Sequence, residues 1–305
     1  MTDDAARVLP TGGAAVGGEV APDARAQNAW VALIRHRSAQ IGIAILAIFV
    51  VGTLVGPLIL HDNPSNNWNY QNLQNSFAHP SLDNLLGTDQ LGRDVLIRLL
   101  YGTRYTLFIA VASIALAVAA GVPLGALSAY LGGWVDILVQ RLVDIILAFP
   151  TFLLALSLVA VLGTGLRNVI IAVAVTSFPN IVRMIRASAL SVREQPYVEA
   201  ARALGVGRTS IMFRHVIPNS LAPVIVMATL LLGAAILSAA GLGFLGVGVQ
   251  QPTPEWGGML GQGQQYIFSD SALITYPGLC IVAAVLAFNL LGDGLRDVLD
   301  PRLKR

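Results

Sequence analysis

The sequence predicts an all-α membrane protein with six transmembrane helices and both termini in the cytoplasm. Composition is the first reason: 55% of its 305 residues are hydrophobic and 12% are charged, against about 25% charged in ordinary soluble domains. The second reason is a set of six long, continuously apolar windows. Because strands of a membrane barrel alternate apolar and polar residues, such runs favour helices. The third reason is the distribution of arginines between the windows.

Each window can form a helix that crosses a hydrocarbon core about 30 Å thick, which takes roughly 20 apolar residues. The windows are Gln40 to Leu60, Tyr105 to Tyr130, Ile137 to Leu162, Val169 to Ile185, Leu221 to Leu245 and Ile274 to Leu291. The fourth is the shortest. Pro150 lies in the middle of the third, where the missing N–H predicts a kink.

Arginines set the orientation, since short cytoplasmic loops are enriched in Lys and Arg. Six arginines lie between Arg183 and Pro218, and the N-terminal arm and C-terminal tail are also basic. Residues 246–273 contain no Lys or Arg. These differences place both termini and the basic loop in the cytoplasm. Residues 61–104 are the exception, because they carry three arginines, accompanied by aspartates, on the predicted outer side.

Two regions divide the chain. Residues 1–38 are predicted to be a disordered cytoplasmic arm, because an Ala- and Gly-rich stretch precedes the first apolar run. Residues 39–305 form the predicted transmembrane domain. No cleavable signal peptide is expected, and the single cysteine, Cys280, is interpreted as a packing residue.

The basic loop, residues 186–218, predicts a compact knob on the cytoplasmic surface. Pro196 suits a first helical turn, and Gly205 suits a helix end because glycine readily adopts a positive φ. Ala200, Ala201 and Leu204 are predicted to share one low-profile face, and Pro218 to begin the return to the membrane. A surface for a soluble partner and an ordinary connector fit this pattern equally well.

The stretch EAARALGVGRTSIMFRHVIPN resembles the EAA motif of binding-protein-dependent ABC importer permeases. GTDQLGRDVLIRLLYGTR, GGWVDILVQRLVDIILAFP, GFLGVGVQQPTPEWGGML and FNLLGDGLRDVLDPRL extend the similarity to the second permease of dipeptide, oligopeptide and nickel importers. The resemblance covers residues 86–305 and implies the bundle of a type I importer permease. The residues implied to contact an ATPase are Glu199, Ala200, Ala201, Arg202, Gly205 and Pro218.

The resemblance also implies partners: a sister permease, two ATPase subunits and an extracytoplasmic substrate-binding protein, all around a subunit embedded in lipid. The sequence contains no G-x-x-x-x-G-K-[ST] phosphate loop. ATP and Mg²⁺ are therefore expected on the partner subunits, and this subunit is expected to be no enzyme and to hold no cofactor or metal. The charge of +2 gives no reason to expect a nucleic-acid partner.

Two positions depart from the family pattern: Ala239, where a Glu often stands, and Gly243, where a Ser often stands. Arg141 and Asp144 are three residues apart in the third window, so they are predicted to pair, either as a gate contact or as a static pair. Residues 246–273 are predicted on the outer side, where they either touch a binding protein or cap the bundle with Trp256 and Tyr266 at the lipid interface. The 87–101 block is expected to form an amphipathic external helix.

Other function classes remain as alternatives. A membrane hydrolase is disfavoured, because no HExxH or GxSxG pattern occurs and the four histidines lie outside the windows. A secondary transporter or channel fits the composition, but no window carries an acidic residue far from its ends. The substrate itself cannot be read from the sequence. Dipeptides, longer peptides and nickel complexes are all compatible with the resemblance.

Overall fold

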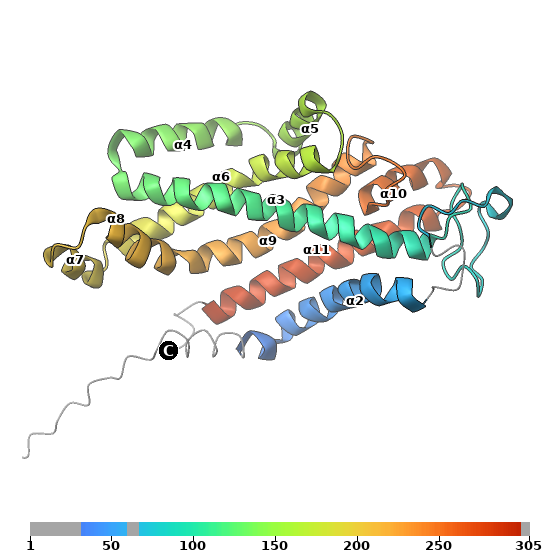
Figure 1. Cartoon of the computed structure of the whole chain (residues 1–305), viewed down its shortest axis with the longest axis horizontal. Helices are drawn as coiled ribbons and strands as arrows, with labels where there is room; N and C mark the ends of the chain where they lie inside the picture. Colours follow the sequence, from blue (N-terminus) through green and yellow to red (C-terminus); the bar gives the residue numbers. More distant parts are fainter. Residues whose placement is uncertain (1–31, 60–66, 300–305) are drawn as a thin grey trace, which may run out of the picture.

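The computed structural model describes residues 32–59 and 67–299, and its regular elements there are helices (Figure 1). The long helices are α2 (Arg37–Ile59), α3 (Val95–Leu131), α6 (Leu166–Arg193), α9 (Ile217–Phe244) and α11 (Ala272–Leu299). The shorter ones are η2 (Leu73–Asn75), α4 (Gly133–Leu147), α5 (Thr151–Leu162), α7 (Pro196–Ala203), α8 (Arg208–Ile211), η3 (Met212–Val216), α10 (Trp256–Gly263) and η4 (Gln264–Tyr266).

The long helices form one elongated bundle. α3 packs chiefly against α6, α6 against α9, α9 against α11, and α11 against α2 (Figure 1). Close approach of α3 to α6 depends on glycine: a Cβ on Gly125 would lie 2.5 Å from the Val182 carbonyl oxygen. A Cβ on Gly42 would likewise lie 2.5 Å from the Ala287 carbonyl oxygen, where α2 meets α11. Small residues thus set the helix spacing, as is usual in membrane bundles.

Five helices in the described residues are long and apolar enough to cross a membrane, and the α4–α5 pair would make a sixth span. The single third span over 137–162 is therefore wrong in detail. Helices α4 and α5 meet at 89°, and Pro150 is the N-cap of α5. The proline stops one helix and starts another, because it has no N–H to continue the hydrogen-bond ladder. The predicted kink is a near right angle.

Other boundaries differ from the windows because hydropathy measures apolarity and not helix length. Helix α3 begins ten residues before Tyr105, so the separate external helix predicted over 87–101 does not exist. Residues 95–101 instead form about the first two turns of α3. Helix α6 continues to Arg193, beyond the predicted end at Ile185.

The predicted arm, residues 1–38, falls mostly on residues 1–31, which lie outside the described part. Residues 32–35 are helical, and the side chain of Leu33 is buried, so the predicted disorder does not extend to residue 38.

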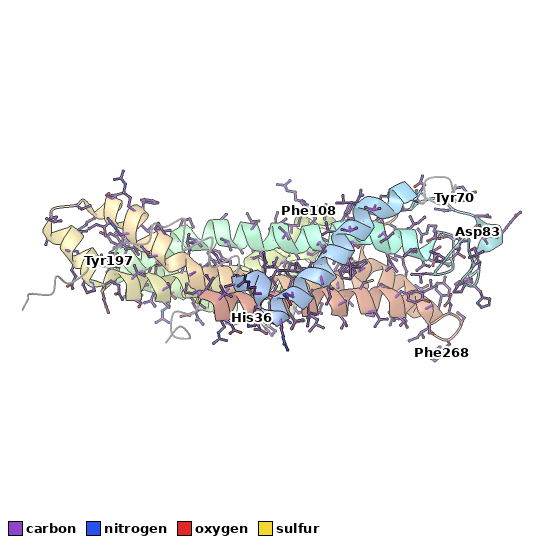
Figure 2. The ribbon with its side chains drawn as sticks, turned by 90° about the horizontal axis from the view of Figure 1, so that it is seen from below. His36, Tyr70, Asp83, Phe108, Tyr197 and Phe268 are labelled. Atoms are coloured by element: carbon purple, nitrogen blue, oxygen red, sulfur yellow. The ribbon has the colours of Figure 1, made fainter. Side chains whose placement is uncertain are left out.

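The two ends of the bundle carry different structures. Figure 2 places Tyr197, on α7, at one end, and Tyr70, Asp83 and Phe268 at the other. The first end is formed by α7, α8 and the last turns of α3 and α6 (Figure 1). The second consists of residues 67–94 and the α9–α11 connection, which includes α10. We call this α9–α11 connection, residues 245–271, the cap.

Candidate functional site

The candidate coupling segment, residues 194–207, connects α6 to α8. Its helix α7 begins at Pro196, as predicted, and carries Glu199 in its first turn and Arg202 in its last, the favourable ends of the helix dipole for these charges. Gly205 follows with φ +79°, and nothing lies within 4 Å of the Cβ it lacks. Glycine is therefore required here by backbone conformation and not by crowding.

One face of α7 is buried and the other is open. Val198 is 0% exposed and Ala201 9% exposed, whereas Glu199, Ala200 and Arg202 are exposed. The prediction of a shared face for Ala200, Ala201 and Leu204 is therefore wrong, since Ala201 points into the protein and Leu204 is 84% exposed. The open surface therefore includes the carboxylate of Glu199, the methyl group of Ala200 and the guanidinium of Arg202.

Val198 attaches the segment to the bundle. It packs in an apolar cluster that draws on four other elements, with Ala129 of α3, Ala189 of α6, Ile211 of α8 and Val216 of η3. Arg193 adds a hydrogen bond from Nη1 to the Ala129 carbonyl oxygen, 3.0 Å away. Helix α7 is therefore packed against the ends of α3 and α6 and against the start of the helical path that leads into α9.

The return to the membrane starts earlier than predicted. Residues Arg208–Phe244 form one continuous helical path of 37 residues, so Pro218 is the second residue of α9 and not the start of the return. A π turn, Met212–Val216, precedes it. Pro218 cannot donate to the preceding turn, and the side chains of Asn219 and Ser220 supply bonds to the carbonyl oxygens of His215 and Val216, both at 2.7 Å.

The predicted Arg141–Asp144 pair is not formed. Asp144 pairs instead with Arg183 of α6, at 2.6 Å, and Arg141 is exposed without an ion pair among the described residues. On a helix, residues three apart share a face, but a partner on a neighbouring helix competes for the carboxylate. Both members of the observed pair are about half exposed, with side-chain exposures of 51% and 47%.

A second ion pair holds α4 to α6 near the coupling segment. Asp136 accepts hydrogen bonds from Arg186 Nε at 2.6 Å and Nη2 at 2.5 Å, a bidentate geometry. It also accepts one from the Ser128 hydroxyl at 2.6 Å. The start of α4 is therefore bonded to both α3 and α6. Sequence reasoning missed this pair, although an acid next to an apolar window signals the need for a partner.

At the opposite end the cap is anchored inside the bundle. Trp256 is 0% exposed and donates from Nε1 to the Leu99 carbonyl oxygen at 3.0 Å. Its predicted location at the lipid interface is therefore wrong. Trp256 lies beside Gly102, whose missing Cβ leaves space for the indole.

Glu255 caps α10 from a buried position. Its carboxylate accepts hydrogen bonds from the N–H groups of Gly257 and Gly258, both at 2.9 Å, and from the Thr106 hydroxyl at 3.3 Å. Burial raises the pKa of Glu255, although these three hydrogen bonds act in the opposite direction. The same carboxylate explains Gly243, because a Cβ there would lie 2.4 Å from Glu255 Oε2. Ala239 is simply a core residue, 2% exposed.

Arg93, Arg98 and Arg104 all have partners inside the protein. Asp89 lies 2.7 Å from Arg93 Nε and 3.6 Å from Arg98 Nε, and all three side chains are buried. Arg104 donates to the Thr53 carbonyl oxygen at 2.7 Å. These three arginines, which were exceptions to the charge rule in the sequence, therefore fasten α2, α3 and residues 67–94 together.

A path for a polar solute needs polar lining, and hydroxyl side chains of α5, α6 and α9 are candidates for it. Thr176 and Ser177 are buried, and the hydroxyls of Ser157 and Thr229 donate to carbonyl oxygens of their own helices. Ser238 is half-buried. No continuous polar path is formed by these residues within this chain.

The family model for the binding-protein-dependent transport system inner membrane component matches residues 121–305, which include the coupling segment, α9 and the cap. This match covers more than half of the chain. The chain belongs to this family of transport components. A second model, the N-terminal TM domain of oligopeptide transport permease C, matches residues 25–80 of this transport component.

Relatives are similar over most of this permease. The dipeptide transport system permease protein DppC of Alkalihalophilus pseudofirmus is 42% identical over 278 residues, which is 91% of this chain and 90% of the relative. The di/tripeptide transport system permease protein DppC of Pseudomonas aeruginosa is 50% identical over 220 residues, 72% of this chain and 73% of the relative. The inner membrane component described here is thus a permease subunit of an ABC importer, of the second-permease type.

A solved structure supports the fold. The permease chain is similar to a chain of the MetNI methionine ABC transporter in an inward-facing conformation, with a TM-score of 0.55 at 23% identity. The match covers 66% of this chain and 96% of that chain. The bundle is therefore that of a type I ABC importer permease, embedded in the membrane by several apolar helices and not itself an ATPase.

Proposed function

We propose that this permease pairs with a sister permease and imports short peptides, driven by two ATPase subunits that dock on the coupling segment. The observation that carries the proposal is the two-sided helix α7. Val198 and Ala201 are buried against the membrane helices, while Glu199, Ala200 and Arg202 face outward. A soluble partner bound to the exposed face of α7 would, when it moves, displace the ends of α3 and α6 that pack against Val198. Gly205 ends the helix of this segment, and Pro218 lies beyond it, in the first turn of α9.

The orientation follows from the same arrangement. The coupling segment and the six arginines of residues 183–214 lie on the cytoplasmic side with both termini, and the cap, which has no Lys or Arg, lies outside. The arginines of residues 67–98 do not contradict this orientation, because Arg93 and Arg98 lie beside Asp89 inside the protein. A substrate-binding protein would then deliver its substrate at the end of the bundle that carries the cap.

A sister permease is supported by the outer surfaces of α4 and α6. The Asp144–Arg183 pair is about half exposed in the isolated subunit. Charged side chains are costly in contact with hydrocarbon. A second permease, or a water-filled path between the two, would provide the surroundings that this pair needs. ATP and Mg²⁺ would be held by the ATPase subunits, because this sequence has no phosphate loop.

A detergent pull-down of the chain with the proteins of its genomic neighbourhood tests the docking role. We compare wild type with Gly205→Glu and with Gly246→Glu, assaying ATP hydrolysis in the eluate. Gly246 is the matched control: it has φ +77°, nothing lies within 4 Å of its missing Cβ, and it lies at the opposite end. ATPase retained by wild type and Gly246→Glu and lost with Gly205→Glu supports docking at this segment.

Other outcomes contradict parts of the proposal. Absence of ATPase from the wild-type eluate would favour a secondary transporter or a channel. Equal loss from both glycine variants would mean that a strained backbone, and not the docking surface, causes the loss. Substrate class is tested separately by uptake of a labelled dipeptide in vesicles, with a nickel chelate as competitor. Uptake of nickel without dipeptide would assign the chain to nickel import.

A further inference from the structure

A cavity of about 470 Å³ lies between the coupling segment and the end of α3. Three arginines from three elements line it: Arg193 at the end of α6, Arg202 in the last turn of α7 and Arg208 at the start of α8. Tyr130 and Leu131, the last two residues of α3, form another wall. The site is therefore assembled where a membrane helix meets the coupling segment.

These arginines lack acidic partners. In the part of the chain that the structure describes, none of the three forms an ion pair, and Arg193 donates only to the Ala129 carbonyl oxygen. Two other arginines of α6, Arg183 and Arg186, do have acidic partners, because each pairs with an aspartate of α4. Like charges around one cavity repel each other, and a bound anion would relieve that repulsion.

We propose that this cavity binds the phosphate headgroup of an anionic phospholipid from the cytoplasmic leaflet. The planar fork of a guanidinium matches phosphate oxygens in bidentate geometry, and three arginines line this one cavity. The cavity is far larger than the roughly 30 Å³ that one water occupies. The proposal rests on the cytoplasmic orientation proposed above, since anionic lipids concentrate in that leaflet.

The surroundings fit a lipid better than an acidic side chain of a protein. Leu131 is 54% exposed at the end of α3, and Trp134, three residues later, is 72% exposed. Tryptophan and tyrosine are the residues that membrane proteins place at headgroup level. The cavity therefore opens beside an apolar and aromatic surface at the membrane boundary, where acyl chains can remain in the bilayer while the headgroup enters.

Such a lipid would brace the coupling segment. Its phosphate would join the end of α6 to α7 and α8, which otherwise meet through the small apolar cluster around Val198. Arg202 would contribute to the lipid site from the last turn of α7, while Glu199 and Ala200 of the same helix face the proposed ATPase. The ATPase rate of the assembled importer should then rise with the fraction of anionic lipid.

The test uses the purified importer complex titrated with short-chain phosphatidylglycerol, short-chain phosphatidylcholine or inorganic phosphate. We compare wild type with Arg193→Gln/Arg208→Gln, leaving Arg202 intact because it belongs to the proposed ATPase contact. Arg214→Gln is the matched control, since Arg214 is an exposed arginine nearby that does not line the cavity. Each lost charge-assisted contact should weaken phosphatidylglycerol binding about tenfold or more.

Tighter binding of phosphatidylglycerol than of phosphatidylcholine, lost in the double variant and kept in Arg214→Gln, supports the site. Equal binding by all variants, or equal loss in Arg214→Gln, overturns it. Inorganic phosphate binding as tightly as the lipid would assign the cavity to a free anion. If the double variant lost the ATPase while its lipid binding was unchanged, the cavity would instead bind an acidic residue of the ATPase. The coupling role proposed for α7 would then still stand.

If the glutamine variant does not purify, Arg193→Lys/Arg208→Lys replaces it. Lysine keeps the charge but has no fork, so phosphatidylglycerol binding should fall several-fold while the complex stays assembled. Unchanged affinity in the lysine variant would overturn the bidentate phosphate site.

Discussion

Asp136 and Arg186 are joined by two hydrogen bonds of 2.6 and 2.5 Å, and this pair fixes the start of α4 against α6. The Ser128 hydroxyl completes the contact from α3. Three helices therefore meet at one carboxylate next to the coupling segment, and the contact leads to a direct test.

A double-mutant cycle with Asp136→Ala and Arg186→Ala should give a coupling energy of about 1 to 2 kcal/mol, because the bonds are bidentate and charge-assisted. Thermal or denaturant unfolding in detergent provides the measurement. The cycle between Arg141 and Asp144 is the control, since these residues share a helix without forming an ion pair. Its coupling should stay below about 0.5 kcal/mol, and a larger value would revive the pairing predicted from the sequence.

Gly125→Ala should destabilise the bundle by roughly 1 to 3 kcal/mol, because the new methyl group would meet the Val182 carbonyl oxygen at 2.5 Å and the backbone of α6 cannot move freely. Gly207→Ala provides the control. Nothing lies within 4 Å of its missing Cβ, and its φ is −61°, so unfolding free energy should change by less than about 0.5 kcal/mol. Equal effects would show that α3 and α6 tolerate wider spacing.

Trp256→Phe should loosen the cap, because it removes the hydrogen bond to Leu99 and part of a fully buried ring. The expected cost is about 1 to 3 kcal/mol. Hydrogen exchange of residues 245–271 is the measurement, and faster exchange should be confined to the cap and the adjoining part of α3. The same substitution at Trp134, which is 72% exposed, should leave this exchange unchanged.

Glu255 should make the cap sensitive to pH. Burial raises the pKa of this carboxyl, so its contribution to stability is fully present below the unfolded pKa and is lost as pH rises through the folded value. We expect the Tm of wild type to fall relative to Glu255→Gln as pH increases from about 5 to about 8. Glu194→Gln, on an exposed carboxylate near the coupling segment, controls for the loss of one charge. Parallel curves for wild type and Glu255→Gln would contradict this expectation.

Hydropathy predicted the fold class well, because membrane insertion depends on long apolar runs. The orientation taken from the arginine distribution stays a prediction. The coupling helix was also predictable, since Pro196 and Gly205 impose their backbone conformations locally. Contacts between helices that are far apart in the sequence were not predictable. The choice of Arg183 over Arg141 as the partner of Asp144, and the burial of Trp256, depend on helices far away in the sequence.

The uninterrupted helix from Arg208 to Phe244 joins the two ends of the molecule. At a rise of 1.5 Å per residue, its 37 residues make a rod about 55 Å long. A tilt of only about 5° at the ATPase end would carry the far end sideways by about 5 Å, roughly the pitch of one helical turn. The far end holds Gly243, packed against Glu255 of the cap. In the proposed importer, the rod would therefore act as a lever arm, converting a small angular stroke at the α7 end into a larger displacement at the cap.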